Sequence, residues 1–207
     1  MMEQRSTEWF AARAGRVTAS RIADVMAKTK SGWGASRGNY LAQLVVERMT
    51  GTCSPGFSNA AMQWGTEKEP EARDCYAFDQ GVSVVEEGFV DHPTIAMAGA
   101  SPDGLVGDDG LVEIKCPNSE THMDTLLGGP IADKYLKQMQ FQMACTGRQW
   151  CDFVSYDPRF GVDMQLHVRR VERDDALIAE IEEAVSAFLA EVDAKVDALT
   201  NLYRKAA

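Results

Sequence analysis

The sequence predicts a mixed α/β domain with helices around a central sheet and a long helix at the C-terminal end. Its 207 residues, 45% hydrophobic and 25% charged, suit one ordinary globular domain. The spacing of apolar residues changes from helical to strand-like and back along the chain. No Gly-, Ser- or Pro-rich linker divides the sequence, so residues 1–207 are treated as one domain.

The N-terminal part, residues 1–80, is expected to be helical. Thr18 and Ser20 can cap a first helix, which runs through Ile22, Val25 and Met26. Ser36 precedes a second helix, which stops at Gly51. One face of this second helix carries the apolar residues Leu41, Leu44, Val45 and Met49.

A loop and a third helix complete this helical part. The loop contains Pro55, Gly56 and Asn59, residue types that favour turns over regular structure. The third helix is expected from about residue 67 to residue 80, and Gly81 would end it.

The middle of the chain, residues 81–171, is expected to form the sheet. Its segments are short, rich in valine and isoleucine, and bounded by Gly, Pro or Asp. The predicted strands lie in residues 82–91, 94–100, 101–107, 111–116, 150–157 and 164–171. A helix is expected over residues 131–146, with the candidate core residues Tyr135, Met139, Phe141 and Met143.

The tail, residues 172–207, is expected to be one amphipathic helix from Asp174 to about Arg204. Its apolar positions are 178, 181, 185, 188, 192, 199 and 202. This near-heptad spacing suits either an oligomer seam or packing on the protein's own sheet, and we favour the sheet.

The charge of the chain is unevenly distributed. The net charge is −10, yet residues 1–50 carry a net +4, against −9 for residues 51–171 and −5 for the rest. A basic N-terminal face beside an acidic middle suits a protein that binds a polyanion and holds divalent cations. The alternative is that the uneven surface charge has no role in binding.

Signals for export, membrane insertion and disulfide formation are lacking in the sequence. The N-terminus has no apolar signal core, and no apolar run approaches the roughly 18 residues of a membrane span. The five cysteines form no CxxC pair, which suggests reduced thiols in a cytosolic protein. The three histidines are scattered and predict no zinc site.

A cluster of charged residues at the end of a predicted hairpin points to chemistry. Glu113 and Lys115 share one face of a strand, because side chains alternate along it, and Ile114 points into the core. Asp103 heads the preceding strand, so a tight turn brings it beside Glu113. Two close carboxylates repel unless a cation holds them, and oxygen ligands favour Mg²⁺ or Mn²⁺ over zinc. With Lys115 nearby, this predicts a site that hydrolyses phosphodiesters.

The pattern has a plainer interpretation. An ExK sequence on an amphipathic strand is usually a solvated salt bridge, and only the preceding PD and a third acid favour catalysis. Glu69 is a candidate for this third acid, on the helix expected to follow Trp64. Spacing alone does not choose it over Glu67 and Glu71.

The order of several motifs resembles the lambda-type phage exonuclease family, also called YqaJ-like viral recombinases, within the PD-(D/E)xK nuclease superfamily. The resemblance covers about residues 5–175. Its motifs are WFAAR at 9–13, GRVTAS at 15–20, WGTEKEPEAR at 64–73, SPDG at 101–104, EIKCP at 113–117, YLKQMQFQM at 135–143 and SYDPRF at 155–160. The resemblance implies a restriction-endonuclease-like core. It also implies 5′-to-3′ degradation of one strand of duplex DNA, leaving a 3′ overhang for a partner annealing protein.

The resemblance assigns roles to individual positions. Asp103 and Glu113 match metal-binding acids, with the carbonyl of Ile114 as a further ligand, and Lys115 matches the catalytic lysine. The remaining catalytic matches are Glu69, Tyr135 and Gln138. The pocket for the terminal 5′-phosphate is matched by Arg13, Ser20, Ser101 and Gln138. Arginine suits such a pocket because its planar guanidinium group can donate two parallel hydrogen bonds to phosphate oxygens.

Two further matches are less specific, and one segment departs from the family. Lys30 matches a basic residue that touches the duplex, and Met62 matches an apolar wedge, although core filler explains Met62 equally well. Family members can carry a basic residue after the CP motif, where this chain has Thr121 and His122. This departure bears on downstream DNA contacts and on processivity.

Together these observations predict a cytoplasmic Mg²⁺-dependent exonuclease, encoded by a phage or prophage in a bacterial host, that acts on double-stranded DNA with 5′-phosphorylated ends. Two cations per site would assist in-line hydrolysis and release 5′-mononucleotides. A ring-shaped homotrimer, implied by the resemblance, would keep an acidic protein on the duplex. The alternatives are an endonuclease on the same core and a non-catalytic nucleic-acid-binding module.

Overall fold

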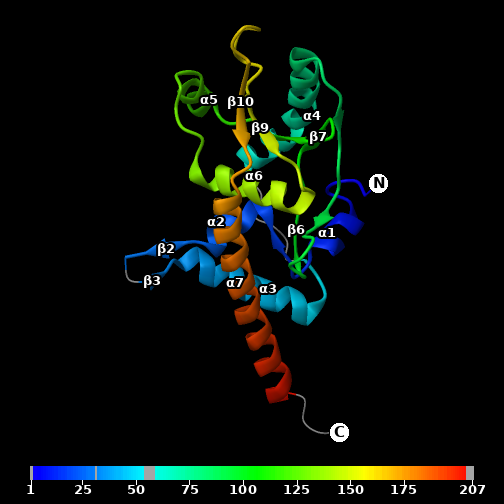
Figure 1. Cartoon of the computed structure of the whole chain (residues 1–207), viewed down its shortest axis with the longest axis vertical. Coiled ribbons are helices and arrows are strands. Elements are labelled where there is room, and N and C mark those ends of the chain that lie inside the picture. The colour runs from blue at the N-terminus through cyan, green and yellow to red at the C-terminus, as the bar shows by residue number, and fades with distance from the viewer. Residues whose placement is uncertain (1, 31, 54–58, 204–207) are drawn as a thin grey trace.

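The computed structural model describes residues 2–30, 32–53 and 59–203 (Figure 1). The helical segments are α1 (Thr7–Arg13), a 3₁₀ turn η1 (Ala19–Arg21), α2 (Ile22–Val25), α3 (Ala35–Thr50), α4 (Ala60–Gln80), α5 (Ser119–Leu126), α6 (Asp133–Thr146) and α7 (Asp175–Tyr203). The strands are β1 (Val17–Thr18), β2 (Lys28–Thr29), β3 (Gly32–Trp33), β4 (Val84–Val85), β5 (Val90–Asp91), β6 (Ala98–Ala100), β7 (Gly104–Val106), β8 (Gly110–Lys115), β9 (Trp150–Tyr156) and β10 (Leu166–Glu172).

The main sheet has the strand order β10-β9-β8-β7-β4. Strands β8 and β9 run parallel, and the other neighbours are antiparallel. The parallel pair is connected through α5 and α6, as parallel strands require a crossover. A small sheet, β1-β6-β5, and the β2–β3 hairpin lie outside the main sheet. The mixed α/β fold class with its long C-terminal helix is thereby confirmed.

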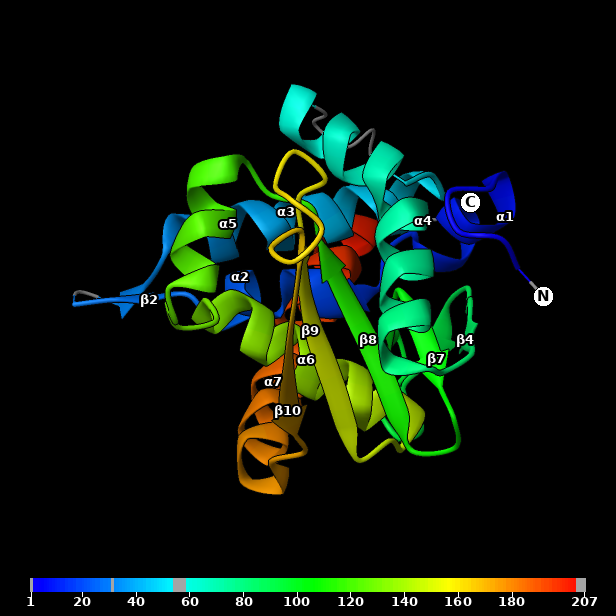
Figure 2. The ribbon, with the colours of Figure 1, turned by 90° about the horizontal axis from the view of Figure 1, so that it is seen from above.

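Helices cover both faces of the main sheet (Figure 2). On one face, Ala72 and Tyr76 of α4 pack on Val112 and Ile114 of β8. On the other face, α6 lies against the sheet through residues such as Met139. The opposite side of α6 carries Phe141 and Cys145, which pack among α2, α3 and α7. Helix α6 therefore packs against a hydrophobic core on each of its two sides, which explains why residues 139–145 are all buried.

The first two helices differ from the sequence-based expectation. Thr18 and Ser20 do not cap a long helix: a 3₁₀ turn follows Thr18 without a side-chain cap, and α2 lasts four residues. The correct start of α3 is Ala35, so Ser36 lies inside the helix. The amide of Gly34 donates to the carbonyl of Ala27 at 2.8 Å. This hydrogen bond holds Gly34 in place directly before the first helical residue, Ala35.

Helix α4 starts well before the expected residue 67. Asn59 does not belong to a loop centre: its side chain accepts from the amide of Met62 at 2.9 Å and caps the helix at Ala60. Gly81, in a left-handed conformation, ends the helix as predicted. The expected loop residues Pro55 and Gly56, and the expected helix end at Arg204, lie outside the described residues.

The middle of the chain contains shorter strands than expected, and one helix that was not expected. The single strand predicted over residues 82–91 is two short strands, β4 and β5, that belong to different sheets. Residues 119–126 form α5, which Asn118 caps by accepting from the amide of Thr121. Periodicity missed α5 because it is only eight residues long.

Helix α7 packs on helices, not on the sheet as expected. Its main contacts are with α3, α6 and α2. Arg37 of α3 donates to both carboxylate oxygens of Glu191 at 2.9 and 2.7 Å and ties the two helices together. The apolar positions up to Val192 are buried, whereas Leu199 and Leu202 are exposed, because the last turns extend past the helices that cover the rest.

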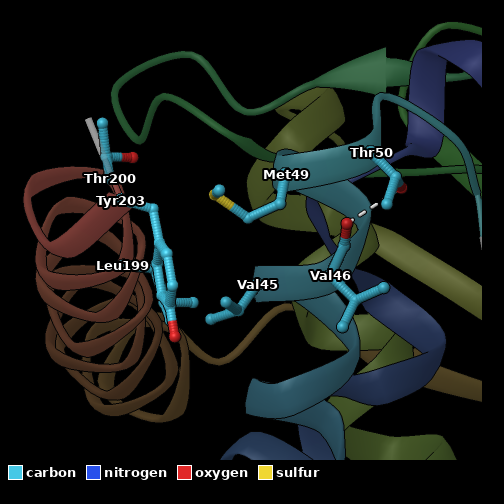
Figure 3. Close-up of a pocket in the computed structure, with 7 residues that line it drawn as sticks. All are labelled: Val45, Val46, Met49, Thr50, Leu199, Thr200 and Tyr203. Atoms are coloured by element: carbon cyan, nitrogen blue, oxygen red, sulfur yellow. Dashed lines mark hydrogen bonds between the residues drawn. The ribbon is translucent and has the colours of Figure 1, made fainter. Parts of the chain in front are cut away.

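The exposed end of α7 and the exposed edge of α3 form an open apolar groove of about 580 Å³ (Figure 3). It is lined by Val45, Val46, Met49, Thr50, Leu199, Thr200 and Tyr203. Met49, on the apolar face predicted for this helix, is exposed and lines this groove. Among the described helices, none combines the length and the apolarity needed to cross a bilayer.

Candidate active site

The β7–β8 hairpin brings the two predicted acids together. Asp103 directly precedes β7, and its Oδ2 accepts a hydrogen bond of 2.7 Å from the amide of Ile114 on β8. Glu113 of β8, which pairs with Phe153 of β9, is fully buried. Lys115, two residues further on the same strand face, is ion-paired with Glu113. The predicted geometry of this hairpin is therefore present.

Two glutamines of α6 hold the buried carboxylate of Glu113. Gln138 Nε2 donates to Oε1 at 2.6 Å, and Gln142 Nε2 donates to Oε2 at 2.7 Å. A buried carboxylate needs such partners, because an unpaired buried charge is strongly destabilising. Tyr135 lies on the same helix, with its ring centroid 5.2 Å from Lys115 Nζ.

The charges of this cluster act on one another. Burial and the charge of Glu113 raise the pKa of Asp103 well above its usual range. Burial alone would lower the pKa of Lys115, but the charges of Glu113 and Asp103 outweigh it and raise this pKa. The cluster is thus a site where carboxylate charge is concentrated, and a bound cation would relieve its repulsion.

Of the three candidate acids on α4, Glu67, Glu69 and Glu71, Glu69 is the one directed toward this cluster. Its charge contributes to the raised pKa of Asp103. Its two oxygens are held by Arg73 Nη2 and Arg5 Nη2, each at 2.9 Å. Glu71 instead accepts from Tyr156 and Lys68, and Glu67 is exposed.

Three of the four residues expected to bind a 5′-phosphate gather beside α1. Arg13 Nη1 donates to Ser101 Oγ at 3.3 Å, and Ser20 lines the same hollow as Arg13, about 560 Å³ in volume. Trp9 supports both partners: its Nε1 donates to Ser101 Oγ at 2.9 Å, and its ring lies 4.0 Å from the Arg13 guanidinium carbon. Gln138 points elsewhere, toward Glu113.

The environment of Arg13 suits an anion. Burial lowers the pKa of Arg13, because desolvation disfavours its cation. An anion bound in the hollow would offset this cost. The hollow lies next to the acid cluster, since Ser101 and Asp103 are two residues apart.

The weaker predictions fall in different places. Met62 lines the hollow beside Arg13 and is half-exposed. Lys30 is exposed at the turn of the β2–β3 hairpin, which both views place on the opposite side of the molecule from α1 (Figures 1 and 2). The structure therefore does not bring Lys30 to the hollow.

The segment that departs from the family pattern is α5. Thr121 is exposed, whereas His122 is fully buried. The His122 ring nitrogens lie 2.8 Å from Ser155 Oγ and from the Met164 carbonyl. His122 therefore joins α5 to β9 and to the loop that follows β9.

Sequence reasoning missed several supporting residues. Gln142 could have been found, because it follows Gln138 by one helical turn in QMQFQ and shares its face. Trp9 was present in a motif but received no role. Arg73 could have been found in the same way as Gln142, because it follows Glu69 by one helical turn in the motif at 64–73. Arg5 left no sequence signal, since its contact to Glu69 is set by the fold.

The donor set fits a hard divalent cation held by few side chains. Among the described residues, no group of three or more His, Cys, Asp or Glu side chains is arranged to hold a metal ion. The carboxylates of Asp103 and Glu113, with backbone oxygen from β8, supply the oxygen ligands that Mg²⁺ prefers. The remaining sites would be filled by water or substrate, as is usual for Mg²⁺.

Comparisons with known proteins show similarity to exonucleases of known structure. The crystal structure of an alkaline exonuclease (LHK-Exo) from Laribacter hongkongensis is 61% identical, with a TM-score of 0.88 over 95% of this chain and 97% of that chain. LHK-Exo in complex with dAMP matches at 62% identity, the same TM-score and the same coverage. A phage related exonuclease from Haemophilus somnus shares the fold, with 15% identity and a TM-score of 0.68 over 89% and 96% of the two chains.

The family comparison covers most of the chain. A search among curated proteins found no match. The family model described as the YqaJ-like viral recombinase domain matches residues 8–149. The chain therefore belongs to the YqaJ-like viral recombinase domain family.

Proposed function

We propose that this protein is a Mg²⁺-dependent exonuclease that degrades one strand of linear double-stranded DNA from its 5′ end. One observation carries the proposal: the Arg13–Ser101 pair and the Asp103–Glu113–Lys115 cluster adjoin through residues 101–103. A pocket for a terminal phosphate next to a hydrolytic cluster suits removal of nucleotides from an end. The likeness to exonucleases supports the same reading.

The proposed metal site uses the carboxylates of Asp103 and Glu113 and the carbonyl of Ile114. When bound, two Mg²⁺ ions, for which Mn²⁺ would substitute, supply Lewis-acid charge stabilisation and lower the pKa of a nearby water. The protein's part is to hold both carboxylates in a fixed position and orientation. The glutamines of α6 fix Glu113, and the Ile114 amide fixes Asp103.

The other residues hold the DNA and stabilise charge. Lys115, paired with Glu113, is placed to stabilise negative charge that develops on the phosphate undergoing cleavage. Tyr135 and Gln138 on α6 border the same place, and Glu69 faces it from α4. Arg13, with Ser101 and Ser20, would hold the terminal 5′-phosphate and so set the direction of digestion.

The biological setting follows from the same proposal. Digestion would release 5′-mononucleotides and leave 3′ overhangs, which a single-strand annealing protein would use in recombination. The protein would act in the cytoplasm of a bacterial host, encoded by a phage or prophage. A homotrimeric ring around the duplex would keep an acidic chain, of net charge −10, on its substrate.

The test is digestion of linear duplex labelled at the 5′ or the 3′ end, with and without Mg²⁺. The expected result is Mg²⁺-dependent release of the 5′ label as mononucleotides, while the 3′-labelled strand shortens only from its far end. A covalently closed circular duplex should stay intact. Cleavage of the circle would favour an endonuclease, and the absence of any cleavage would favour a binding module.

A further inference from the structure

The first residues of the described chain lie against residues 87–88 and Pro102, and one of them reaches Glu69. We use the name N-terminal strap for residues 2–6. Gln4 Nε2 donates to the carbonyls of Glu87 at 2.7 Å and Pro102 at 2.8 Å. The strap also lies on Gly88, where a Cβ atom would come within 2.5 Å of the Met2 carbonyl oxygen, so only glycine admits this approach. These contacts fix the strap in place.

The strap turns the side chain of Arg5 toward the cluster. Arg5 has a φ of 69°, in the left-handed region that residues other than glycine adopt rarely. Strained backbone of this kind gathers at functional sites, where the surrounding contacts enforce it. In this conformation Arg5 Nη2 reaches Glu69 Oε2 at 2.9 Å.

Arg5 differs from the other cations near the acids in its exposure. Arg73 is 12% exposed and donates to the carbonyl of Asp103 and to Glu69 and Glu86. Lys115 is paired with Glu113. The Arg5 side chain is 46% exposed. A guanidinium has five N–H donors, so Arg5 can bind phosphate oxygens while it keeps the bond to Glu69.

The position of Arg5 separates its role from that of Arg13. The N-terminal segment contacts residues 101 and 102 at two different points: Trp9 and Arg13 donate to Ser101, and Gln4 donates to the carbonyl of Pro102. Arg13 is thus at the end pocket, and Arg5 is on the side of the acids. Resting on the proposed function, we infer that Arg5 binds an internal backbone phosphate of the DNA beside the bond that is cleaved.

The experiment measures binding, not cleavage. Fluorescence anisotropy gives the Kd of fluorescent duplexes with a 5′-phosphate or a 5′-hydroxyl, in Ca²⁺ to prevent turnover, over a range of salt concentrations. Arg5→Ala should bind both duplexes about tenfold more weakly, to the same extent. The slope of log K against log salt should fall by about 1, as expected for one lost phosphate contact.

Matched variants isolate the contact. Arg5→Lys should show the parent's slope of log K against log salt, because the positive charge remains. Arg5→Gln should show the same reduced slope as Arg5→Ala, because the charge is gone. Lys195→Ala, which also removes one positive charge but on α7, away from the strap, should bind as the parent does. Melting temperatures show whether each variant is folded, and Arg5→Lys and Arg5→Gln decide the matter if Arg5→Ala does not fold.

Two outcomes overturn the inference. An unchanged Kd and salt slope in Arg5→Ala would make Arg5 only a counter-ion of Glu69. A loss confined to the 5′-phosphorylated duplex would place Arg5 in the end pocket. Either result would overturn the role of Arg5 even if the parent protein is a fully active nuclease. If instead the parent releases no nucleotides, the proposed function is wrong, and the binding measurement on Arg5 can still be made.

Discussion

Glu113 has no exposed surface, and its partners explain how a carboxylate is kept in such a place. Both of its oxygens accept hydrogen bonds, from Lys115 and Gln138 at one and from Gln142 at the other. Within the described part of the chain, Gln142 Oε1 is buried and has no hydrogen-bond partner. Gln142 thus makes one strong bond to a charge and leaves an acceptor unpaired, a cost that folds accept mainly at functional sites.

The first residue-scale prediction concerns Asp103. Asp103→Ala removes a proposed metal ligand but none of the residues proposed to hold phosphate. Nucleotide release in Mg²⁺ should fall to background, while the Kd for duplex DNA stays within about threefold of the parent, because no charge-assisted phosphate contact is lost. Release near the parent rate would show that the metal ligands lie elsewhere.

The second concerns Arg13. The parent should degrade 5′-phosphorylated duplex faster than 5′-hydroxyl duplex. In Arg13→Ala the phosphorylated duplex should be degraded about tenfold more slowly, since a charge-assisted contact to phosphate contributes roughly 1.5–3 kcal/mol. The ratio of the two rates, measured for both proteins at one salt concentration, is decisive. An equal slowing on both duplexes would make Arg13 a general DNA contact.

At the scale of elements, the start of β8 depends on a close approach to β9. Gly110 pairs with Trp150, and a Cβ at Gly110 would lie 2.1 Å from the Trp150 ring. Gly110→Ala should therefore lower the free energy of unfolding by about 2–3 kcal/mol, because the ring or the strand must shift. Urea unfolding measures the effect. Gly161→Ala, where no atom lies within 4 Å of the added methyl, is the control and should change stability by less than about 1 kcal/mol.

Helix α5 and the loop between β9 and β10 are held together by Asp157. Burial would raise the pKa of Asp157, but hydrogen bonds from Arg159 and Ser119 outweigh it and lower the pKa to about 2. A pKa lowered on folding gives stability that is present above pH 4 and lost as the pH falls toward 2.

The corresponding variant is Asp157→Asn. Near pH 7 it should be less stable than the parent by about 1–2 kcal/mol, a value reduced because half-exposed Arg159 is screened by solvent. Urea unfolding at several pH values should show the difference narrowing below pH 4. A difference that stays constant from pH 7 to pH 3 would mean that the asparagine acts through packing and not through charge.

At the scale of the whole molecule, the acid cluster and the long helix occupy different layers. The cluster lies where α4, the main sheet and α6 meet, whereas α7 packs on α2, α3 and α6 on the far side. The open groove between α3 and the end of α7 therefore lies in a different layer from the acid cluster (Figure 1).

The prediction at this scale concerns assembly. If a ring retains the DNA, light scattering at working concentration should give a mass well above the 22.7 kDa of the chain, near three times that value. Raising the salt should not dissociate it if apolar surface holds the subunits together. A monomer at all concentrations would contradict the ring, and the source of processivity would then have to be sought in the DNA contacts.

The sequence by itself determined the fold class, the family and the hairpin that pairs Asp103 with Glu113. These features depend on local order: alternation along a strand, a tight turn and motifs in sequence. The stop residues Gly51 and Gly81 were predicted for the same reason, because a helix end is set by a few neighbouring residues.

Only the tertiary structure decided the features that depend on contacts between distant segments. Sequence could not show that α7 packs on helices, because an amphipathic face has the same pattern whatever it packs on. Nor could it show that Gln142 holds Glu113 or that Arg5 reaches Glu69 across 64 positions. Such contacts carry no periodic signal, since the packing of whole elements brings their side chains together.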